Sequence, residues 1–85
     1  MATTPTLLIV DDEKTQREGL RAALEDRYDV YLAEDAKSAT ELLEREHFDV
    51  LLTDFRLPNE DGMKLIARAK SLCKSAVWKA IWRAR

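Results

Sequence analysis

Three short apolar segments alternate with longer stretches of helical periodicity, and this alternation constrains the fold more than any other feature. The segments are residues 7–10, 29–33 and 49–53. Each has the length and composition of a strand in a parallel sheet. Between them, apolar residues recur at helical spacing, as with Leu20, Ala23 and Leu24 and then with Ala39, Leu42 and Leu43. We therefore predict strand, helix, strand, helix, strand, helix, in a doubly wound α/β sheet with right-handed crossovers.

The last part of the chain has a different character. Residues 62–85 carry seven basic and no acidic side chains, whereas residues 1–61 carry seven basic and all 16 acidic ones. Apolar residues recur at three- and four-residue steps from Leu65 to Ala84, with no Gly or Pro after Gly62. This pattern predicts one long helix of about 20 residues, with Trp78 and Trp82 four residues apart beside its apolar stripe.

The composition excludes several classes of protein. Hydrophobic residues make up 46% and charged residues 35% of the chain, which is typical of a globular domain. The single cysteine, Cys73, excludes an internal disulfide framework, and we expect it to be a small core residue. No apolar run approaches the roughly 20 residues of a membrane span, and the N-terminus lacks the features of a signal peptide. A cytoplasmic protein without membrane contact is therefore expected.

Acidic residues follow the first and third predicted strands. Asp11 and Asp12 come directly after residues 7–10, and Asp54 comes directly after residues 49–53. If these strands are neighbours, the three carboxylates meet at the carboxyl edge of the sheet, where ligands of such folds bind. Their repulsion would favour a cation, and Mg²⁺ prefers oxygen ligands. The alternative is that Asp12 or Glu13 only caps the first helix.

The combined motif resembles the response-regulator receiver domain. An apolar strand runs into Asp11-Asp12-Glu13, and a second apolar strand about 40 residues later ends in Asp54. Phe55-Arg56-Leu57-Pro58 and then Asp61-Gly62 complete the pattern. The match spans roughly residues 5–72, and its detail is most similar to receivers of the NtrC type, which regulate sigma-54-dependent transcription.

The resemblance implies a two-component phosphorelay function, without enzyme activity of its own. Asp54 would accept phosphate from a histidine kinase. Asp12 and Asp54 would bind Mg²⁺ directly, Asp11 mainly through water, and the backbone carbonyl of Arg56 would complete the site. Pro58 and Gly62 would shape the following loop, and Gly62 would begin the third helix.

The chain departs from the family after Leu72. Receivers have the strand order 2-1-3-4-5 of the flavodoxin-like fold. We expect only strands 2-1-3 here, followed by the long helix, with no fourth strand ending in Ser or Thr and no fifth strand ending in Lys. The lysines of this region (Lys70, Lys74 and Lys79) belong to the helical pattern. Residues 1–72 would thus be a partial receiver domain, and residues 73–85 a basic, Trp-containing helical extension.

Truncation has two expected consequences. Phosphotransfer would lose charge stabilisation, and the third strand would become an open sheet edge that invites another chain. We therefore expect a homodimer through this edge, the C-terminal helix, or both. The competing hypothesis is a remnant or engineered fragment that dimerises without signalling. His47 is expected in an exposed loop, and Trp78 and Trp82 as packing anchors. The basic tail carries no DNA-reading motif, so we do not expect a nucleic-acid partner.

Overall fold

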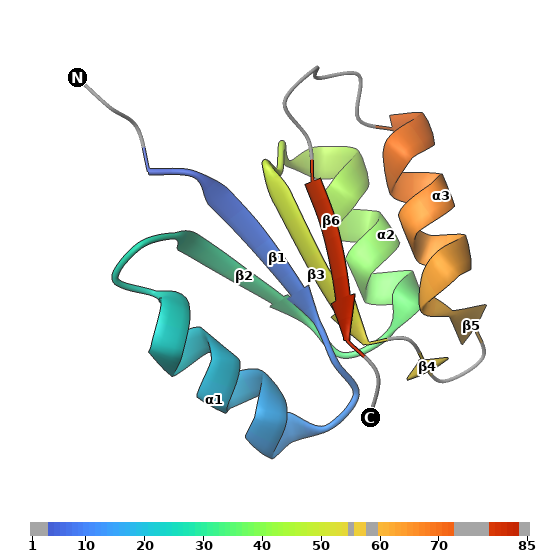
Figure 1. Cartoon of the computed structure of the whole chain (residues 1–85). Helices are drawn as coiled ribbons and strands as arrows, with labels where there is room; N and C mark the ends of the chain where they lie inside the picture. The colour runs from blue at the N-terminus through green and yellow to red at the C-terminus, as the bar shows by residue number, and fades with distance from the viewer. Residues whose placement is uncertain (1–3, 55, 58–59, 73–78, 84–85) are drawn as a thin grey trace.

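The computed structural model describes residues 4–54, 56–57, 60–72 and 79–83. Strands and helices alternate along this part of the chain except that two short strands follow β3 (Figure 1). In order, they are β1 (Thr6–Val10), α1 (Lys14–Leu24), β2 (Asp29–Ala33), α2 (Ala36–Arg45), β3 (Val50–Asp54), β4 (Arg56–Leu57), β5 (Glu60–Asp61), α3 (Gly62–Leu72) and β6 (Lys79–Arg83). None of the helices in these residues combines the length and the apolar character that a membrane span requires.

Four parallel strands form the main sheet in the order β2-β1-β3-β6. The predicted α/β class and the order 2-1-3 are confirmed. β1 lies in the interior of the sheet, with β2 on one side and β3 on the other. The short strands β4 and β5 form a separate antiparallel pair just after β3. Gly62 is the first residue of α3, as expected.

The helices cover the two faces of the sheet unequally. The crossover from β1 to β2 runs in the opposite direction to the crossovers from β2 to β3 and from β3 to β6. Because such crossovers are right-handed, α1 lies on one face and α2 and α3 lie on the other. Figure 1 shows α2 and α3 side by side behind the sheet, and their packing against each other agrees with this view.

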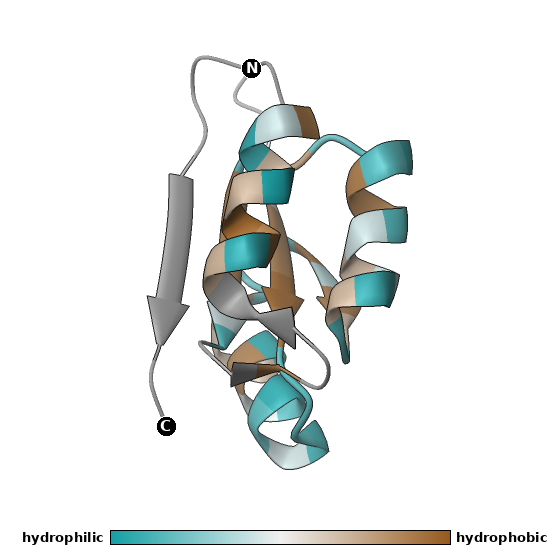
Figure 2. Cartoon of the chain, turned by 90° about the vertical axis from the view of Figure 1, so that its right-hand side faces the viewer, coloured by the Kyte–Doolittle hydropathy of each residue, from teal (hydrophilic) through white to brown (hydrophobic). Residues whose placement is uncertain are grey.

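The α2/α3 face holds the hydrophobic core. Leu8, Leu51 and Leu65 are fully buried there, and Phe48 meets the ring of Tyr31 edge-to-face at a centroid distance of 5.2 Å. The strands at the middle of the sheet are hydrophobic, whereas the helices carry hydrophilic residues on their outer sides (Figure 2). Three residues of α2 and three of α3 are buried in this layer: Ala36, Ala39, Leu43, Leu65, Ile66 and Ala69. The amphipathic pattern of the sequence therefore places both helices on the sheet.

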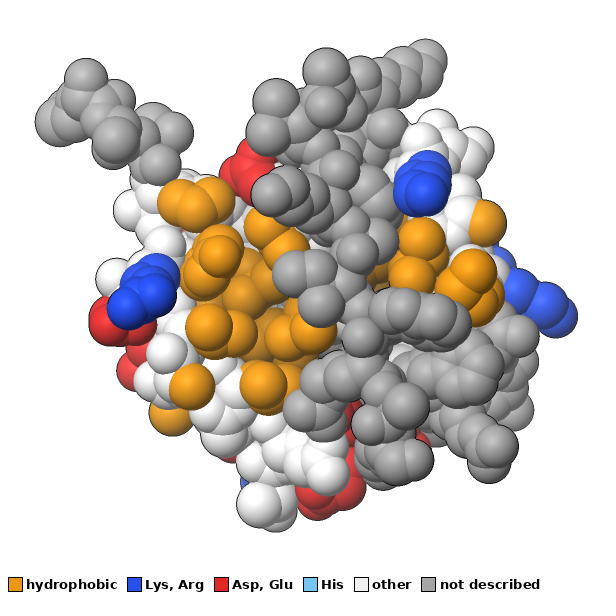
Figure 3. Space-filling view, in the orientation of Figure 1, with side chains coloured by type: hydrophobic (Ala, Val, Ile, Leu, Met, Phe, Trp, Pro, Cys, Tyr) orange, Lys and Arg blue, Asp and Glu red, His pale blue; other side chains and the backbone are white. Residues whose placement is uncertain are grey.

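The α1 face is covered less completely. Not one residue of α1 is fully buried, although Leu20 and Leu24 are half-buried. Successive side chains of a strand point to opposite faces, so the neighbours of the core residues face this side. Apart from Leu7 and Ile9, which are buried, these apolar residues of the first three strands keep partial exposure: Val30, Leu32, Val50 and Leu52. Figure 3 shows hydrophobic side chains gathered on this surface.

The predicted long C-terminal helix is wrong. α3 ends at Leu72, and residues 79–83 form the strand β6, so the extension is not helical there. Lys79 and Trp82 belong to this strand, whereas Cys73, Lys74 and Trp78 lie outside the described residues. The backbone N–H and C=O groups along an open edge of β3 would otherwise lack protein partners, and pairing with β6 satisfies them. Tertiary pairing has overridden the helical spacing of the apolar residues.

The predicted open edge at the third strand is also wrong. β6 pairs with all five residues of β3, from Val50 with Lys79 to Asp54 with Arg83. A fourth strand is therefore present, contrary to expectation, and it ends at Arg83 where the family pattern has Ser or Thr. The edge on which we expected a second chain is occupied by this chain itself, and the outer strands of the sheet are β2 and β6.

Candidate functional site

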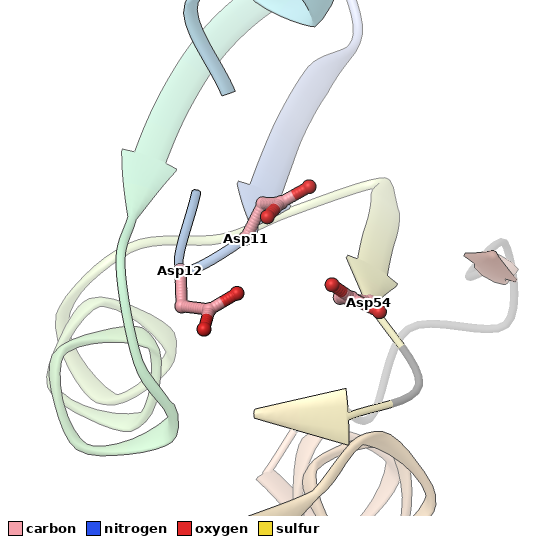
Figure 4. Close-up of side chains that lie close together, drawn as sticks. All are labelled: Asp11, Asp12 and Asp54. Atoms are coloured by element: carbon pink, nitrogen blue, oxygen red, sulfur yellow. The ribbon is translucent and has the colours of Figure 1, made fainter. Parts of the chain in front are cut away.

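Three carboxylates meet at the carboxyl edge of the sheet, as the sequence predicted. β1 and β3 pair in parallel with Val10 opposite Thr53, so Asp11 and Asp54 leave the sheet at the same level. One carboxylate oxygen from each of Asp11, Asp12 and Asp54 lies within 4.8 Å of the other two (Figure 4). Asp11 and Asp54 are 1% exposed, whereas Asp12 is exposed. The cluster thus has two buried carboxylates and one that faces solvent.

The backbone at Asp11 is held from three directions. Its N–H donates to the carbonyl of Ala33 on β2 at 3.1 Å. Its carboxylate Oδ1 accepts from the N–H of Glu13 at 2.9 Å, and its carbonyl accepts from Nη1 of Arg17 at 2.8 Å. At the other strand, the hydroxyl of Thr53 donates to the carbonyl of Asp54 at 3.0 Å. These bonds fix the main chain that carries the acidic side chains.

The structure shows which acidic residue caps the first helix. The Glu13 carboxylate accepts from the N–H groups of Thr15 and Gln16, both at 3.2 Å, and is the N-cap of α1. Asp12 belongs to the acidic cluster instead. The N-cap of α1 is therefore Glu13 and not Asp12.

The charge and ligand chemistry of the site fit a small hard cation. Three carboxylates within 4.8 Å repel one another, and a divalent cation between them would offset that repulsion. All the donor atoms are oxygens, as Mg²⁺ and Ca²⁺ prefer, and the exposed side at Asp12 leaves room for the waters that Mg²⁺ retains. The residues present thus suit such an ion.

The structure leaves two predicted contributors to the site, Arg56 and Pro58, untested. Arg56 begins β4 directly beyond the acidic cluster and pairs with Asp61, and its carbonyl as a ligand stays a prediction. Pro58 lies outside the described residues. His47 is confirmed as exposed: its side chain keeps 58% of its surface accessible, and Nε2 lies 3.3 Å from Oδ1 of Asp49.

Arg17 and Thr53 contact the site backbone, and the sequence did not single out either. Arg17 is one of several charged residues of α1 that lie outside the predicted apolar face of the helix. Its spacing of six residues from Asp11 is the one signal available, because a long side chain in the first turns of a helix can reach back to the preceding loop. Thr53 is a fully buried polar residue near the end of an apolar strand.

Comparison with known proteins gives the family. The response regulator receiver domain matches this sequence over residues 7–77, most of the chain. The chain belongs to the response regulator receiver domain family. Receiver domains are signalling domains and not enzymes, in agreement with our expectation for this chain.

Two related regulatory proteins support this assignment. The hydrogenase transcriptional regulatory protein HoxA of Bradyrhizobium diazoefficiens is 36% identical over 72 residues, which are 85% of this chain and 15% of that protein. The response regulator protein PilR of Pseudomonas aeruginosa is 48% identical over 60 residues, 69% of this chain and 14% of that protein. This receiver therefore spans a small part of the length of these two relatives.

The solved structure of a response regulator protein is similar in its backbone. The crystal structure of a response regulator protein from Burkholderia pseudomallei superposes with a TM-score of 0.85 at 27% sequence identity. The match covers 94% of this chain and 46% of that one. That structure contains a phosphorylated aspartic acid, a calcium ion and citrate.

Proposed function

We propose that this receiver accepts a phosphoryl group on Asp54 and binds Mg²⁺ beside it. The observation that carries the proposal is the meeting of Asp11, Asp12 and Asp54 within 4.8 Å at the carboxyl edge of a receiver sheet. The similar Burkholderia pseudomallei protein, which holds a phosphorylated aspartic acid and a calcium ion, supports both parts of the proposal.

Each acidic residue has a distinct role in this proposal. Asp12 and Asp54 bind Mg²⁺ directly, Asp11 acts through water, and the Arg56 carbonyl completes the ligand set. Bound Mg²⁺ supplies positive charge that offsets the charge on the transferring phosphoryl oxygens. Burial of Asp54 leaves few solvent molecules to compete with its carboxylate as the nucleophile.

The phosphoryl donor is a phosphohistidine of a histidine kinase. A carboxylate oxygen of Asp54 forms a bond to phosphorus while the phosphorus–nitrogen bond of the donor breaks. The imidazole leaves with the electron pair of that bond and takes a proton from water. The product is an aspartyl phosphate, which adds negative charge to the acidic edge of the sheet.

Transfer should be slow in the chain as it stands. Receivers normally supply a hydroxyl and a lysine to the phosphoryl oxygens from later strands. β6 ends at Arg83 and not at Ser or Thr, and no strand carrying that lysine is present in the described residues. Loss of such preorganised donors commonly lowers a rate by about 10²–10³-fold each.

Incubation with acetyl phosphate and Mg²⁺, followed by intact-mass measurement, tests the proposal. We expect a slow gain of about 80 Da, one phosphoryl group, which Asp54→Asn abolishes. Asp26→Asn is the matched control, because Asp26 is an exposed acid in the turn after α1. A mass gain that persists in Asp54→Asn, or its absence in the parent chain over many hours, would contradict phosphorylation at Asp54.

The wider role follows from the relatives. We propose that this receiver is cytoplasmic and controls transcription through an output region of an NtrC-type, sigma-54-dependent regulator. Support comes from the motif detail and from the likeness to HoxA, a transcriptional regulatory protein. Phosphorylation-dependent reporter expression, measured with the receiver fused to a sigma-54 activator output domain, tests this role.

A non-signalling homodimer is the second candidate. One observation favours it: apolar side chains on the α1 face remain partly exposed, and α1 has no fully buried residue (Figure 3). A second copy of the chain could cover this face through a symmetric contact. Sedimentation equilibrium at low micromolar concentration tests it, with Leu32→Lys as the disrupting variant; a folded monomer of the parent chain would exclude the dimer.

A further inference from the structure

Arg17 connects the first helix to the acidic site without belonging to the acidic cluster. It is the fourth residue of α1, and its side chain is partly buried. Its Nη1 donates to the carbonyl oxygen of Asp11 at 2.8 Å. A hydrogen bond from a charged donor is shorter and stronger than a neutral one, so this contact has a defined geometry.

The Asp11 carbonyl lies at a sensitive point of the site. The carbonyl of Asp11 and the N–H of Asp12 belong to one planar peptide unit. The Asp11 end of this unit is already held, because the Asp11 N–H donates to Ala33 at 3.1 Å and the Asp11 carboxylate accepts from Glu13 at 2.9 Å. The bond from Arg17 adds a constraint on the rotation of the peptide plane, and so on the direction in which the chain enters Asp12.

The Asp11–Asp12 peptide carries Asp12, the exposed member of the acidic cluster. Asp11 and Asp54 are buried, so surrounding atoms restrict their side chains, whereas Asp12 is exposed. The backbone fixes the direction of the Cα–Cβ bond of Asp12, and this bond sets where the carboxylate can reach. Rotation of the peptide plane would therefore change the distance from the Asp12 carboxylate to those of Asp11 and Asp54.

We infer that Arg17 is a positioning residue that sets the divalent-cation affinity of the acidic site through the Asp11–Asp12 peptide. The inference rests on the proposed Mg²⁺ site. Arg17 does not bind the cation itself; its guanidinium orients the main chain between two of the acidic residues. Groups that orient metal ligands in this indirect way commonly change metal affinity by about 10-fold or more when removed.

The positive charge of Arg17 would have the opposite effect from its hydrogen bond. A guanidinium near a cation site repels the cation, so removing the charge alone would strengthen Mg²⁺ binding. Removing the constraint on the peptide would weaken Mg²⁺ binding. The sign of the change therefore separates positioning from simple electrostatics.

Calorimetric titration of the full chain with Mg²⁺ alone tests the inference. We expect Arg17→Met to bind Mg²⁺ about 10-fold more weakly. Arg17→Gln, which is polar but too short to reach the Asp11 carbonyl, should show a similar loss. Arg17→Lys keeps a charged donor of sufficient length and should recover most of the affinity. Each titration is run well below the unfolding midpoint measured for that variant, so a merely structural role of Arg17 would leave the affinity unchanged.

Arg21→Met is the matched control. Arg21 lies one turn further along α1, is about half exposed, and pairs with Glu18 at 2.8 Å. Its loss should change Mg²⁺ affinity by less than about twofold, because exposed ion pairs have small effects. Affinity that is unchanged or stronger in Arg17→Met, or in Arg17→Gln if Arg17→Met does not fold, would overturn the inference. A parent chain that binds no Mg²⁺ would instead overturn the proposed metal site itself, and this inference with it.

Discussion

The two faces of the central sheet differ in how completely they are covered. On one face, α2 and α3 each bury three apolar residues against the strands. On the other, α1 buries none fully, and Val30, Leu32, Val50 and Leu52 stay partly exposed. Hydrophobic stabilisation grows with the apolar area removed from water, so the α2/α3 face contributes the larger share.

We expect the two faces to contribute differently to stability and to the acidic site. The acidic site lies at the carboxyl ends of β1 and β3, and both strands contribute residues to both faces of the sheet. The packed face holds these strands at fixed spacing, whereas the α1 face supplies the loop and the arginine that orient the aspartates. We therefore expect substitutions on the first face to lower the free energy of unfolding, and those near the start of α1 to alter metal binding.

A matched pair of leucine truncations tests the difference in packing between the two faces most directly. Leu65 on α3 is fully buried, whereas Leu20 on α1 is half-buried, and both are helical. Leu65→Ala should lower the free energy of unfolding by about 3 kcal/mol, and Leu20→Ala by about 1 kcal/mol. Urea denaturation followed by circular dichroism measures both. Equal losses would show that the α1 face is packed as tightly as the other face in solution.

Mg²⁺ should raise the free energy of unfolding by the same amount whether or not the packing of the α1 face is weakened. At a free concentration about ten times its dissociation constant, a cation that binds only the folded state adds about 1.4 kcal/mol to the free energy of unfolding. The gain should be equal in the parent chain and in Leu20→Ala, and absent in Asp54→Asn. Thermal unfolding with Mg²⁺ and with EDTA measures it; a gain retained by Asp54→Asn would place the ion elsewhere.

The N-caps of α2 and α1 should show a smaller difference in stability between the two faces. Asp35 caps α2 with an oxygen 2.8 Å from the N–H of Ser38, whereas Glu13 caps α1 at 3.2 Å. Asp35→Ala should cost about 1 kcal/mol and Glu13→Ala about half of that. Denaturant titrations of both variants measure the difference, and a larger loss in Glu13→Ala would reverse the ranking.

The Asp35 cap should also depend on pH. Hydrogen bonds from the Ser38 backbone and then from its hydroxyl lower the pKa of Asp35 from 3.8. Because the folded pKa is depressed, the stabilisation is fully present above the unfolded value and is lost as pH falls through the folded value. The cost of Asp35→Ala should thus be constant near neutrality and shrink below about pH 4. A cost that persists at low pH would mean that the charged form is not what caps α2.

The sequence predicted the parts of the fold that short-range patterns control. The first three strands follow from apolar runs, and the acids that end two of these runs mark the site. The order of the strands, which brings Asp11, Asp12 and Asp54 together, came from the resemblance to receiver domains. β6 was missed because its residues sit within a helical spacing of apolar side chains. The open edge of β3 decides its conformation, and that edge exists only once the sheet has formed.

The contact from Arg17 to the site could not be predicted from sequence patterns for a similar reason. Arg17 is one charged residue among several on α1, and no periodicity distinguishes it from Arg21. Its role depends on where the helix starts relative to the strand, which Glu13 fixes by capping. Acidic residues after strands are thus visible in a sequence, whereas the contact from Arg17 to the Asp11 carbonyl depends on a loop conformation.

The position of β1 in the sheet has a consequence for how the protein is made. β1 is the first strand in the chain but an inner strand of the sheet, so its neighbours on both sides are synthesised after it. Its pairing with β3 joins residues some forty positions apart, which requires a large loop to close before either strand is stabilised. The nascent β1 therefore emerges with two unpaired edges, and deletion of this strand would divide the sheet instead of trimming it.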